Sequence, residues 1–150
     1  MAVPDHLVAL VAGEPQDETW EPVFPLLTVD GDGFPRVCLL SRGELRLQRD
    51  AVRCVVRARR TRANLDRDPR GLLMIVHGES AYYLRLTVRR ALDDERDRGV
   101  LAVEFAVDLV EEDTLHVPLR AMNYRATERV RRVERTDDNR ELLERLAHMA

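Results

Sequence analysis

The densest group of side chains suited to binding chemistry lies between positions 57 and 64. It combines four arginines with a hydroxyl and an amide: Arg57, Arg59, Arg60, Thr61, Arg62 and Asn64. Guanidinium groups, a hydroxyl group and the free amides of a helix start are the donors that best hold a phosphate monoester. A β-branched strand precedes the group and a short helix begins at about Thr61, so the sequence predicts an anion site at a strand-to-helix junction. The alternative, a solvated loop whose arginines pair with Asp66 and Asp68, has equal weight from composition alone.

A second candidate is Arg36, at the start of a strand that ends near Ser41. A neighbouring strand could place Arg36 beside Arg60. In a regular strand, however, Arg36 shares a face with Cys38 and Leu40, whereas Ser41 lies on the other face. A β-bulge would be needed for Arg36 and Ser41 to contact one ligand.

Other chemistries lack a motif. All 24 basic side chains are arginine, which excludes Schiff-base lysines and the lysine of phosphate-binding loops. The four histidines and two cysteines match no metal-ligand spacing, so no metal is predicted. No serine-hydrolase elbow or dinucleotide-binding fingerprint is present. The catalytic residues therefore stay unknown.

Length and charge set the broad class. At 150 residues the chain fits one domain, residues 1–150, that can bury a core without disulfides. The net charge of −3 argues against nucleic acid as a partner. Cys38 and Cys54 lie in apolar strand patterns, and no signal peptide or long apolar run appears, so the sequence predicts a reduced, cytoplasmic protein that does not bind a membrane.

Hydrophobic periodicity predicts a mainly β fold with short flanking α-helices. Asp30-Gly31-Asp32-Gly33 separates two apolar runs, and such Asp-Gly pairs are typical of a tight hairpin. Strands are predicted at 23–29, 34–40, 45–47, 52–56, 72–76, 82–92 and 101–110, and helices at 6–11, 61–66 and 137–149. Asp5 is the expected cap of the first helix, and Asp137 or Asp138 that of the last. Residues 117–124 are ambiguous.

The segments LLTVDGDGFPRVCLL and RRTRANLDRDPRGLLMIV, and more faintly YYLRLTVRRAL, resemble the pyridoxamine 5′-phosphate oxidase-like, FMN-binding split-barrel family. The resemblance covers roughly two-thirds of the chain. It implies a six-stranded antiparallel split β-barrel and a homodimer with FMN bound between subunits. It also implies cofactor contacts from two segments: Arg36, Leu39, Leu40 and Ser41 in the first, and Arg57, Arg60, Thr61, Arg62 and Asn64 in the second. Ser41 and Thr61 stand where the family often has lysine.

Two functional hypotheses follow. The first is an FMN-dependent oxidoreductase-like protein of unknown substrate, in which the flavin supplies the redox chemistry. The second is a non-catalytic dimeric module that binds a phosphorylated ligand, a deazaflavin or haem for sensing, storage or stress protection. Retained, reducible flavin favours the enzyme, and a colourless protein indifferent to FMN favours the module.

Overall fold

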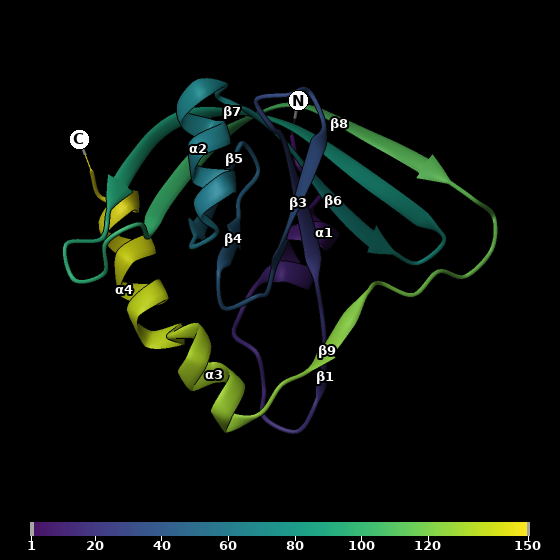
Figure 1. Ribbon diagram of the computed structural model, residues 1–150. Helices are drawn as coiled ribbons and strands as arrows, with labels where there is room; N and C mark the ends of the chain where they lie inside the picture. The colour runs from purple at the N-terminus through teal and green to yellow at the C-terminus, as the bar shows by residue number, and fades with distance from the viewer. Residues whose placement is uncertain (1, 150) are drawn as a thin grey trace.

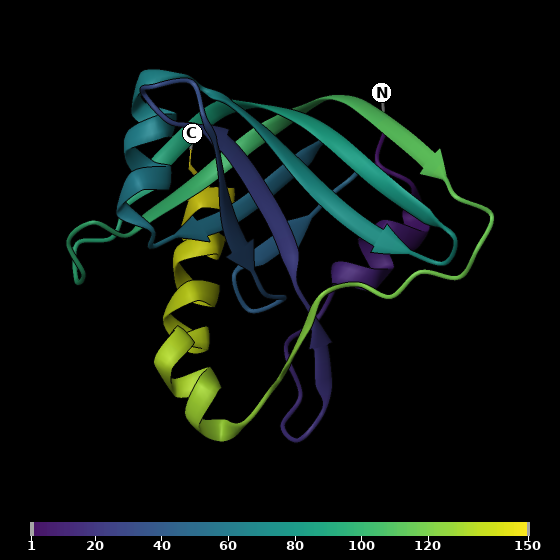
Figure 2. The ribbon, with the colours of Figure 1, turned by 45° about the vertical axis from the view of Figure 1, so that its right-hand side comes forward.

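The computed structural model describes residues 2–149, and the fold is mainly β. Within these residues, seven antiparallel strands form one sheet that curls into an open half-barrel, in the order β3-β2-β6-β7-β8-β5-β4 (Figure 2). Its strands are β2 (Phe24–Val29), β3 (Pro35–Leu40), β4 (Leu45–Leu47), β5 (Ala51–Val56), β6 (Arg70–His77), β7 (Ser80–Asp93) and β8 (Leu101–Thr114). A small separate sheet pairs β1 (Trp20–Pro22) with β9 (Asn123–Arg125) (Figure 1).

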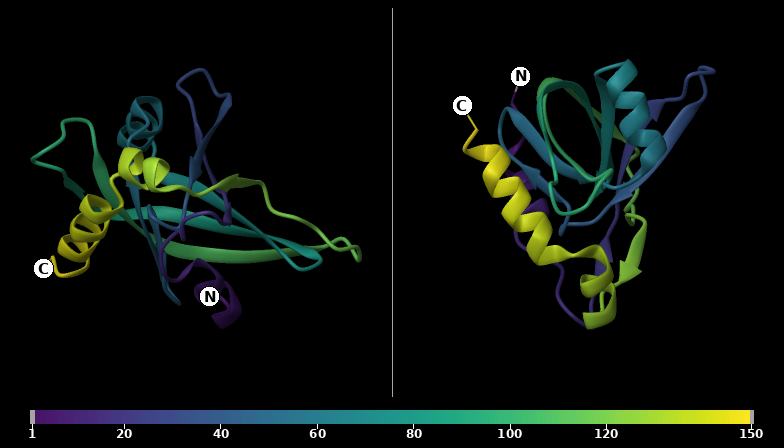
Figure 3. Two further views of the ribbon diagram at one scale, coloured as in Figure 1. Left: turned by 90° about the horizontal axis from the view of Figure 1, so that it is seen from below. Right: turned by 60° about the vertical axis from the view of Figure 1, so that its left-hand side comes forward.

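Four helices accompany the sheets in the described part of the chain: α1 (Asp5–Val11), α2 (Arg59–Arg67), α3 (Glu128–Glu134) and α4 (Thr136–Ala147). Helix α2 contacts β2, β3 and β5, while α4 contacts β5, β7 and β8. Helices α3 and α4 follow one another along one side of the half-barrel (Figure 3). The residues predicted to bind a cofactor therefore lie on β3, after β5 and on α2, in a part of the fold where α2 contacts both strands.

The hairpin of β2 and β3 is built as its turn residues predict. Asp30 N–H donates to Phe34 O over 2.8 Å, and Gly33 N–H donates to Asp30 O over 2.9 Å. Gly33 has a φ of 89°, a conformation that favours glycine. The register pairs residues 24–29 with 40–35 without interruption, so β3 contains no bulge.

The interior of the half-barrel is aliphatic and continuous. Its largest fully buried side chains include Phe24, Phe105, Leu84 and Ile75. Strand β6 buries Leu73 and Ile75 in this core, whereas Leu72, Met74 and Val76 are half-buried on its other face. Cys38 and Cys54 are both free thiols. No helix among residues 2–149 has the length and apolar character needed to span a membrane.

Three details differ from the sequence-based expectation. The main sheet has seven strands rather than the six of the family barrel, because β4 pairs with β5 at the sheet edge. The N-cap of α1 is Pro4 rather than Asp5, and the N-cap of α4 is Arg135 rather than an aspartate; Asp5, Asp137 and Asp138 instead lie in first turns, where their charge favours the helix dipole. Strands β1 and β9 and helix α3 were not predicted.

One charged side chain is fully enclosed between the central strands. Glu104 of β8 is 1% exposed and accepts hydrogen bonds from Arg53 of β5 over 2.6 Å and from Arg90 of β7 over 3.0 Å. Burial would raise the pKa of Glu104, but the bonds from Arg90 and Arg53 outweigh it and lower the pKa. Glu104 therefore joins three neighbouring strands as an ion.

Replacing this carboxylate should destabilise the whole sheet. In Glu104→Gln, Arg53 and Arg90 keep their positive charges without a counter-ion, and breaking a buried pair in this way costs about 3 kcal/mol or more. We expect the free energy of unfolding, measured by urea denaturation, to fall by that amount. The matched control is Glu111→Gln, also on β8, whose pair with Arg85 is exposed and should contribute below about 1 kcal/mol. Equal losses in both variants would contradict a special role for Glu104.

Candidate functional site

Helix α2 begins without a side-chain cap. Ala58 is the N-cap in an extended conformation, and no side chain caps the helix start. The first backbone bond of the turn joins Arg62 N–H to Ala58 O over 3.0 Å, so the amides of residues 59–61 have no partner within the helix. The helix starts two residues before the predicted Thr61. Its first turn presents free amides and the exposed side chains of Arg59 and Arg60.

One cluster of predicted residues surrounds Asp30, in the turn between β2 and β3. Arg36 donates to the Asp30 carboxylate through Nε over 2.8 Å and Nη2 over 3.0 Å. Asn64 of α2 donates to Asp30 over 2.8 Å and to Thr28 over 3.0 Å. The bonds from Arg36 and Asn64 lower the pKa of Asp30 to about 2. Arg60 lies at the same end, in an open pocket of about 310 Å³ that Asp30, Asp32 and Asn64 also line.

Thr61 is the innermost donor at the helix start. Only 1% of the residue is exposed, and its hydroxyl has no hydrogen-bond partner among the described residues. A buried hydroxyl without a partner loses its bonds to water and gains none in return. We call the first turn of α2, with Arg60 and Thr61, together with Arg36 and Asn64 beside Asp30, the anion end.

A second cluster lies at the other end of β3, where Ser41 follows the strand. Ser41 donates to Glu134 of α3 over 3.2 Å, and its backbone N–H donates to Glu44 over 3.1 Å. Arg57, at the end of β5, donates to Asn139 of α4 over 2.6 Å and lies 3.9 Å from Glu44. This buried polar cluster, as we call it, consists of Ser41, Glu44, Arg57, Tyr124, Glu134 and Asn139.

The cluster leaves several polar atoms without partners. Nε and Nη1 of Arg57 and the hydroxyl of Tyr124 are buried and make no hydrogen bond within the described residues. Burial raises the pKa of Glu44 to about 7, although the hydrogen bond from Ser41 N–H lowers it. Burial also raises the pKa of Glu134. Burial, followed by the charge of Glu134, raises the pKa of Tyr124 to about 12. Two acids in one enclosed space thus retain protons more readily than in water.

The polar residues of the site do not all converge. Arg36 bonds to Asp30 and Ser41 to Glu134, at opposite ends of a β3 strand that lacks a bulge. Arg62 turns away and pairs with Asp93. The seven predicted polar residues thus separate: Arg36, Arg60, Thr61 and Asn64 lie at the anion end, Ser41 and Arg57 lie in the buried polar cluster, and Arg62 lies in neither.

The two leucines of the predicted site face different surroundings. Leu40 is in the core, whereas Leu39 is 52% exposed on the outer face of the sheet. Val37 is 53% exposed on that face, and its partner in register is Leu27 of β2, which pairs in turn with Leu72 of β6. An open groove of about 530 Å³ runs beside them over Leu27 and Leu72. The outer face of β3, β2 and β6 therefore carries an apolar surface around Val37 and Leu39, next to a groove that Asp68, Arg70, Arg85 and Asp108 also line.

Several residues of the site were not expected from the sequence. Asp30 was assigned only to the turn, and its local spacing to Arg36 could have indicated the ion pair. Glu134 and Asn139 reach Ser41 and Arg57 across 93 and 82 positions of the chain, and no local pattern signals such contacts. No three His, Cys, Asp or Glu side chains among residues 2–149 are placed to hold a metal ion.

Comparison with solved structures identifies the fold. A protein named F420 reductase aligns over 61% of this chain and 90% of its own, at 12% identity and a TM-score of 0.52. An FMN-binding protein from Syntrophomonas wolfei aligns over 65% and 78%, at 16% identity and a TM-score of 0.51. A Clostridium acetobutylicum protein of the pyridoxinephosphate oxidase family aligns over 69% and 85%, at 12% identity and a TM-score of 0.51.

At these identities the likeness establishes the fold alone. The chain has the split-barrel fold of flavin-binding proteins, which confirms the fold that the sequence resemblance predicted. No protein-family model and no curated protein matches the sequence.

The raised pKa of Glu44 has a consequence for stability. The unfolded chain releases this proton near pH 4.5, whereas the folded protein holds it until about pH 7. The folded state binds more protons between these values, so the free energy of unfolding should fall as the pH rises from 4.5 to 7. Glu44→Gln keeps an acceptor for Ser41 N–H but cannot ionise. At pH 8 it should be more stable than the wild type by up to about 3 kcal/mol.

Urea denaturation at a series of pH values measures this difference. Glu95→Gln, at an exposed position, is the control and should follow the wild-type profile. A Glu44→Gln profile parallel to the wild type from pH 4.5 to 8 would show that this side chain does not hold a proton in the folded protein.

Proposed function

We propose that the protein is an FMN-binding, oxidoreductase-like protein of the cytoplasm that acts as a homodimer. The observation that carries this proposal is the anion end, where an uncapped helix start, an exposed arginine and a buried hydroxyl without a partner lie together. A flavin phosphate supplies the acceptors that these donors lack. The split-barrel fold, shared with a protein named as FMN-binding, supports the choice of ligand.

The residues at the anion end fit a phosphate monoester. Arg60 and the amides of residues 59–61 would hold its oxygens, and the Thr61 hydroxyl would donate a further bond. Arg36 would add positive charge, although Asp30 already neutralises part of it. When bound, the flavin would supply hydride or electron transfer, and the chain would supply binding, orientation and exclusion of water.

The apolar outer face supports a dimer. Val37 and Leu39 stand next to each other on one face of an edge strand, and an exposed apolar edge of this kind favours association with another chain. A second copy that covers β3, β2 and β6 would bury these side chains. The same copy would form one wall of a groove along β3, with flavin between the subunits.

The second candidate function is a non-catalytic dimeric module that binds a phosphorylated ligand, a deazaflavin or haem. The pairing of the expected contacts favours it, because Arg36 is neutralised by Asp30 and Ser41 is bonded to Glu134. Such a module would hold a phosphate without presenting a reactive ring to a substrate. Reduction of a bound flavin by dithionite and its reoxidation by an added acceptor would separate the two functions.

Charge reversal at the anion end tests the ligand. The wild type should retain a flavin absorbance band after incubation with FMN and gel filtration. Arg60→Glu should weaken FMN binding at least about tenfold, because it replaces a charge-assisted bond of about 1.5–3 kcal/mol by repulsion. Flavin fluorescence quenching measures the Kd.

The control is Arg98→Glu, which makes the same charge change at an exposed position in the loop before β8. It should leave the Kd within about twofold of the wild-type value, which corresponds to less than 0.5 kcal/mol. Equal FMN affinity in the wild type and in folded Arg60→Glu would remove Arg60 from the site. Absence of FMN binding by the wild type would exclude the flavin.

A charge on the outer face tests the dimer. Leu39→Arg places a cation among the exposed apolar side chains of the edge strand β3 and should shift the protein from dimer to monomer in size-exclusion chromatography with light scattering. Val133→Arg, at an exposed valine of α3 outside this surface, should stay dimeric. A wild type that is monomeric at micromolar concentration, or a dimeric Leu39→Arg, would contradict this interface.

A further inference from the structure

Helices α3 and α4 are attached to the half-barrel in different ways. Helix α4 buries Leu142, Leu143 and Leu146 in an apolar cluster with Val55, Val100 and Ala102, so hydrophobic packing fixes its position. Helix α3 buries no side chain. It is attached through polar contacts, and moving it away would expose little apolar surface.

Helix α3 is held by side-chain contacts to Ser41 and Asp17 and by two bonds from α4. Thr136 donates to Arg131 O over 3.3 Å, and Asn139 donates to Glu134 O over 2.9 Å. Glu134, the last residue of α3, accepts the bond from Ser41, and Arg131 pairs with Asp17, with both partners about two-fifths exposed. Exposed pairs of this kind contribute about 1 kcal/mol or less in other proteins. The bond between Glu134 and Ser41 is therefore the main side-chain contact between α3 and the buried polar cluster.

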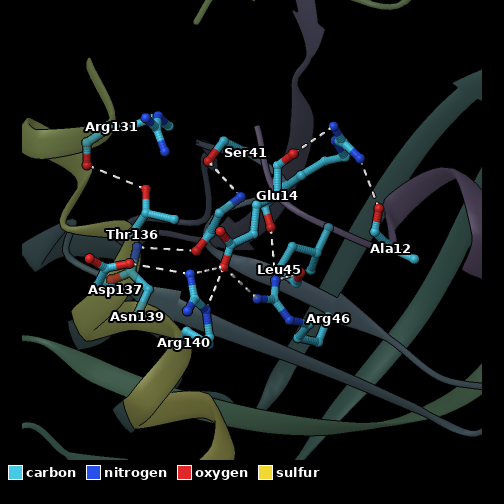
Figure 4. A network of polar contacts seen from close by, with 12 residues as sticks. Ala12, Glu14, Ser41, Leu45, Arg46, Arg131, Thr136, Asp137, Asn139 and Arg140 are labelled. Atoms are coloured by element: carbon cyan, nitrogen blue, oxygen red, sulfur yellow. Dashed lines mark hydrogen bonds and ion pairs between the residues drawn. The ribbon is translucent and has the colours of Figure 1, made fainter. Parts of the chain in front are cut away.

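The junction between the helices is a single C-cap residue, Arg135, whose N–H donates to Arg131 O and Arg132 O. Arg135 adopts the left-handed conformation, with a φ of 57° and a ψ of 52°, which non-glycine residues adopt rarely. Beyond it, Asn139 anchors α4 by donating to Gly43 O over 3.2 Å and accepting from Arg57 over 2.6 Å. Figure 4 shows Thr136 and Asn139 of α4 on the helix side of the site, with Thr136 bonded to Arg131 O of α3. Asn139 also donates to Glu134 O over 2.9 Å, so opening of α3 about Arg135 has to break this bond as well.

Helix α3 covers the residues that remain without partners. Ser41 is 3% exposed beneath it. Asn139 donates to Glu134 O over 2.9 Å and accepts from Arg57 over 2.6 Å, which places Arg57 near the end of α3. Two nitrogens of Arg57 and the Tyr124 hydroxyl are buried without bonds there. These atoms would gain partners if a ligand replaced α3.

We propose that α3 is a lid over the buried polar cluster, that it opens about Arg135, and that the ring of a bound flavin competes with closed α3 for Ser41. The identity of the ligand rests on the proposed function, and the lid itself rests on the contacts of α3. The ring of FMN has carbonyl oxygens that can accept from Ser41 and from the unpartnered nitrogens of Arg57. In the closed form, the Ser41 hydroxyl already donates its hydrogen bond to Glu134.

Removing the contact between lid and cluster tests the proposal. Glu134→Ala should open α3, because the bond to Ser41 is lost. Amides of residues 130–134 should exchange hydrogen several-fold faster than in the wild type, measured by mass spectrometry on the whole protein. FMN should bind about tenfold tighter, since the binding-competent form is no longer a minor population.

Two matched variants isolate the role of the acceptor. Glu134→Gln retains an oxygen for Ser41 and should keep wild-type exchange and affinity. Glu128→Ala removes an exposed carboxylate from the start of the same helix and should leave FMN affinity and the exchange of residues 130–134 unchanged. Exchange in β7 and β8 should be the same in all variants, which establishes that each is folded.

Addition of FMN to the wild type separates the lid from the ligand. The proposal expects FMN to speed exchange in α3 while it slows exchange at the start of α2. Slower exchange in α3 with FMN would overturn the competition. If neither the wild type nor Glu134→Ala binds FMN, the proposed function fails. The lid can then be tested in the ligand-free proteins. Equal hydrogen exchange of residues 130–134 in Glu134→Ala and Glu128→Ala would overturn the proposal that the Glu134 contact holds α3 closed.

Discussion

The ion cluster around Glu104 is the constraint on which the site geometry depends. Glu104 lies on β8, between Arg53 of β5 and Arg90 of β7, so one buried carboxylate fixes three adjacent strands. Strand β5 runs on from Arg53 to Val56, and Arg57 and Ala58 then lead into α2, which carries part of the anion end. Arg90 also donates to Met149 O, next to the end of α4. Both sides of the candidate site are therefore tied to the same carboxylate.

The use of arginine as the only basic side chain other than histidine shapes the rest of the site. A guanidinium group donates in a planar fork, so one carboxylate can bind it through two bonds, as Asp30 binds Arg36. A lysine in the position of Ser41 or Thr61 would carry its own charge into the site. Here those positions hold short hydroxyl side chains, and charge comes from arginines on neighbouring elements. The hydroxyl of Ser41 can consequently be taken by an acid of the same chain.

The sequence predicts those features that depend on local chemistry. Asp30 to Gly33 sets the first hairpin, and the apolar runs set the strands, because turn geometry and alternation act over a few residues. The helix start beside Arg60 and Thr61 is predicted for the same reason. The contact of Ser41 with Glu134 joins positions 93 residues apart and depends on how α3 and α4 pack, so it has no local signature. The short strands β1 and β9 likewise form only because the folded chain brings them together.

The separation of the two ends has an energetic consequence for the lid. A ligand shifts a conformational equilibrium only through a difference in affinity for the two conformations. The anion end does not include α3, so phosphate contacts there form equally well with α3 open or closed. However tightly a phosphate binds at the anion end, it leaves the equilibrium between open and closed α3 unchanged. Only groups that reach Ser41 discriminate between the two forms. The lid therefore responds to the ring of a ligand and not to its phosphate, which lets a protein with a general anion site distinguish one phosphorylated molecule from another.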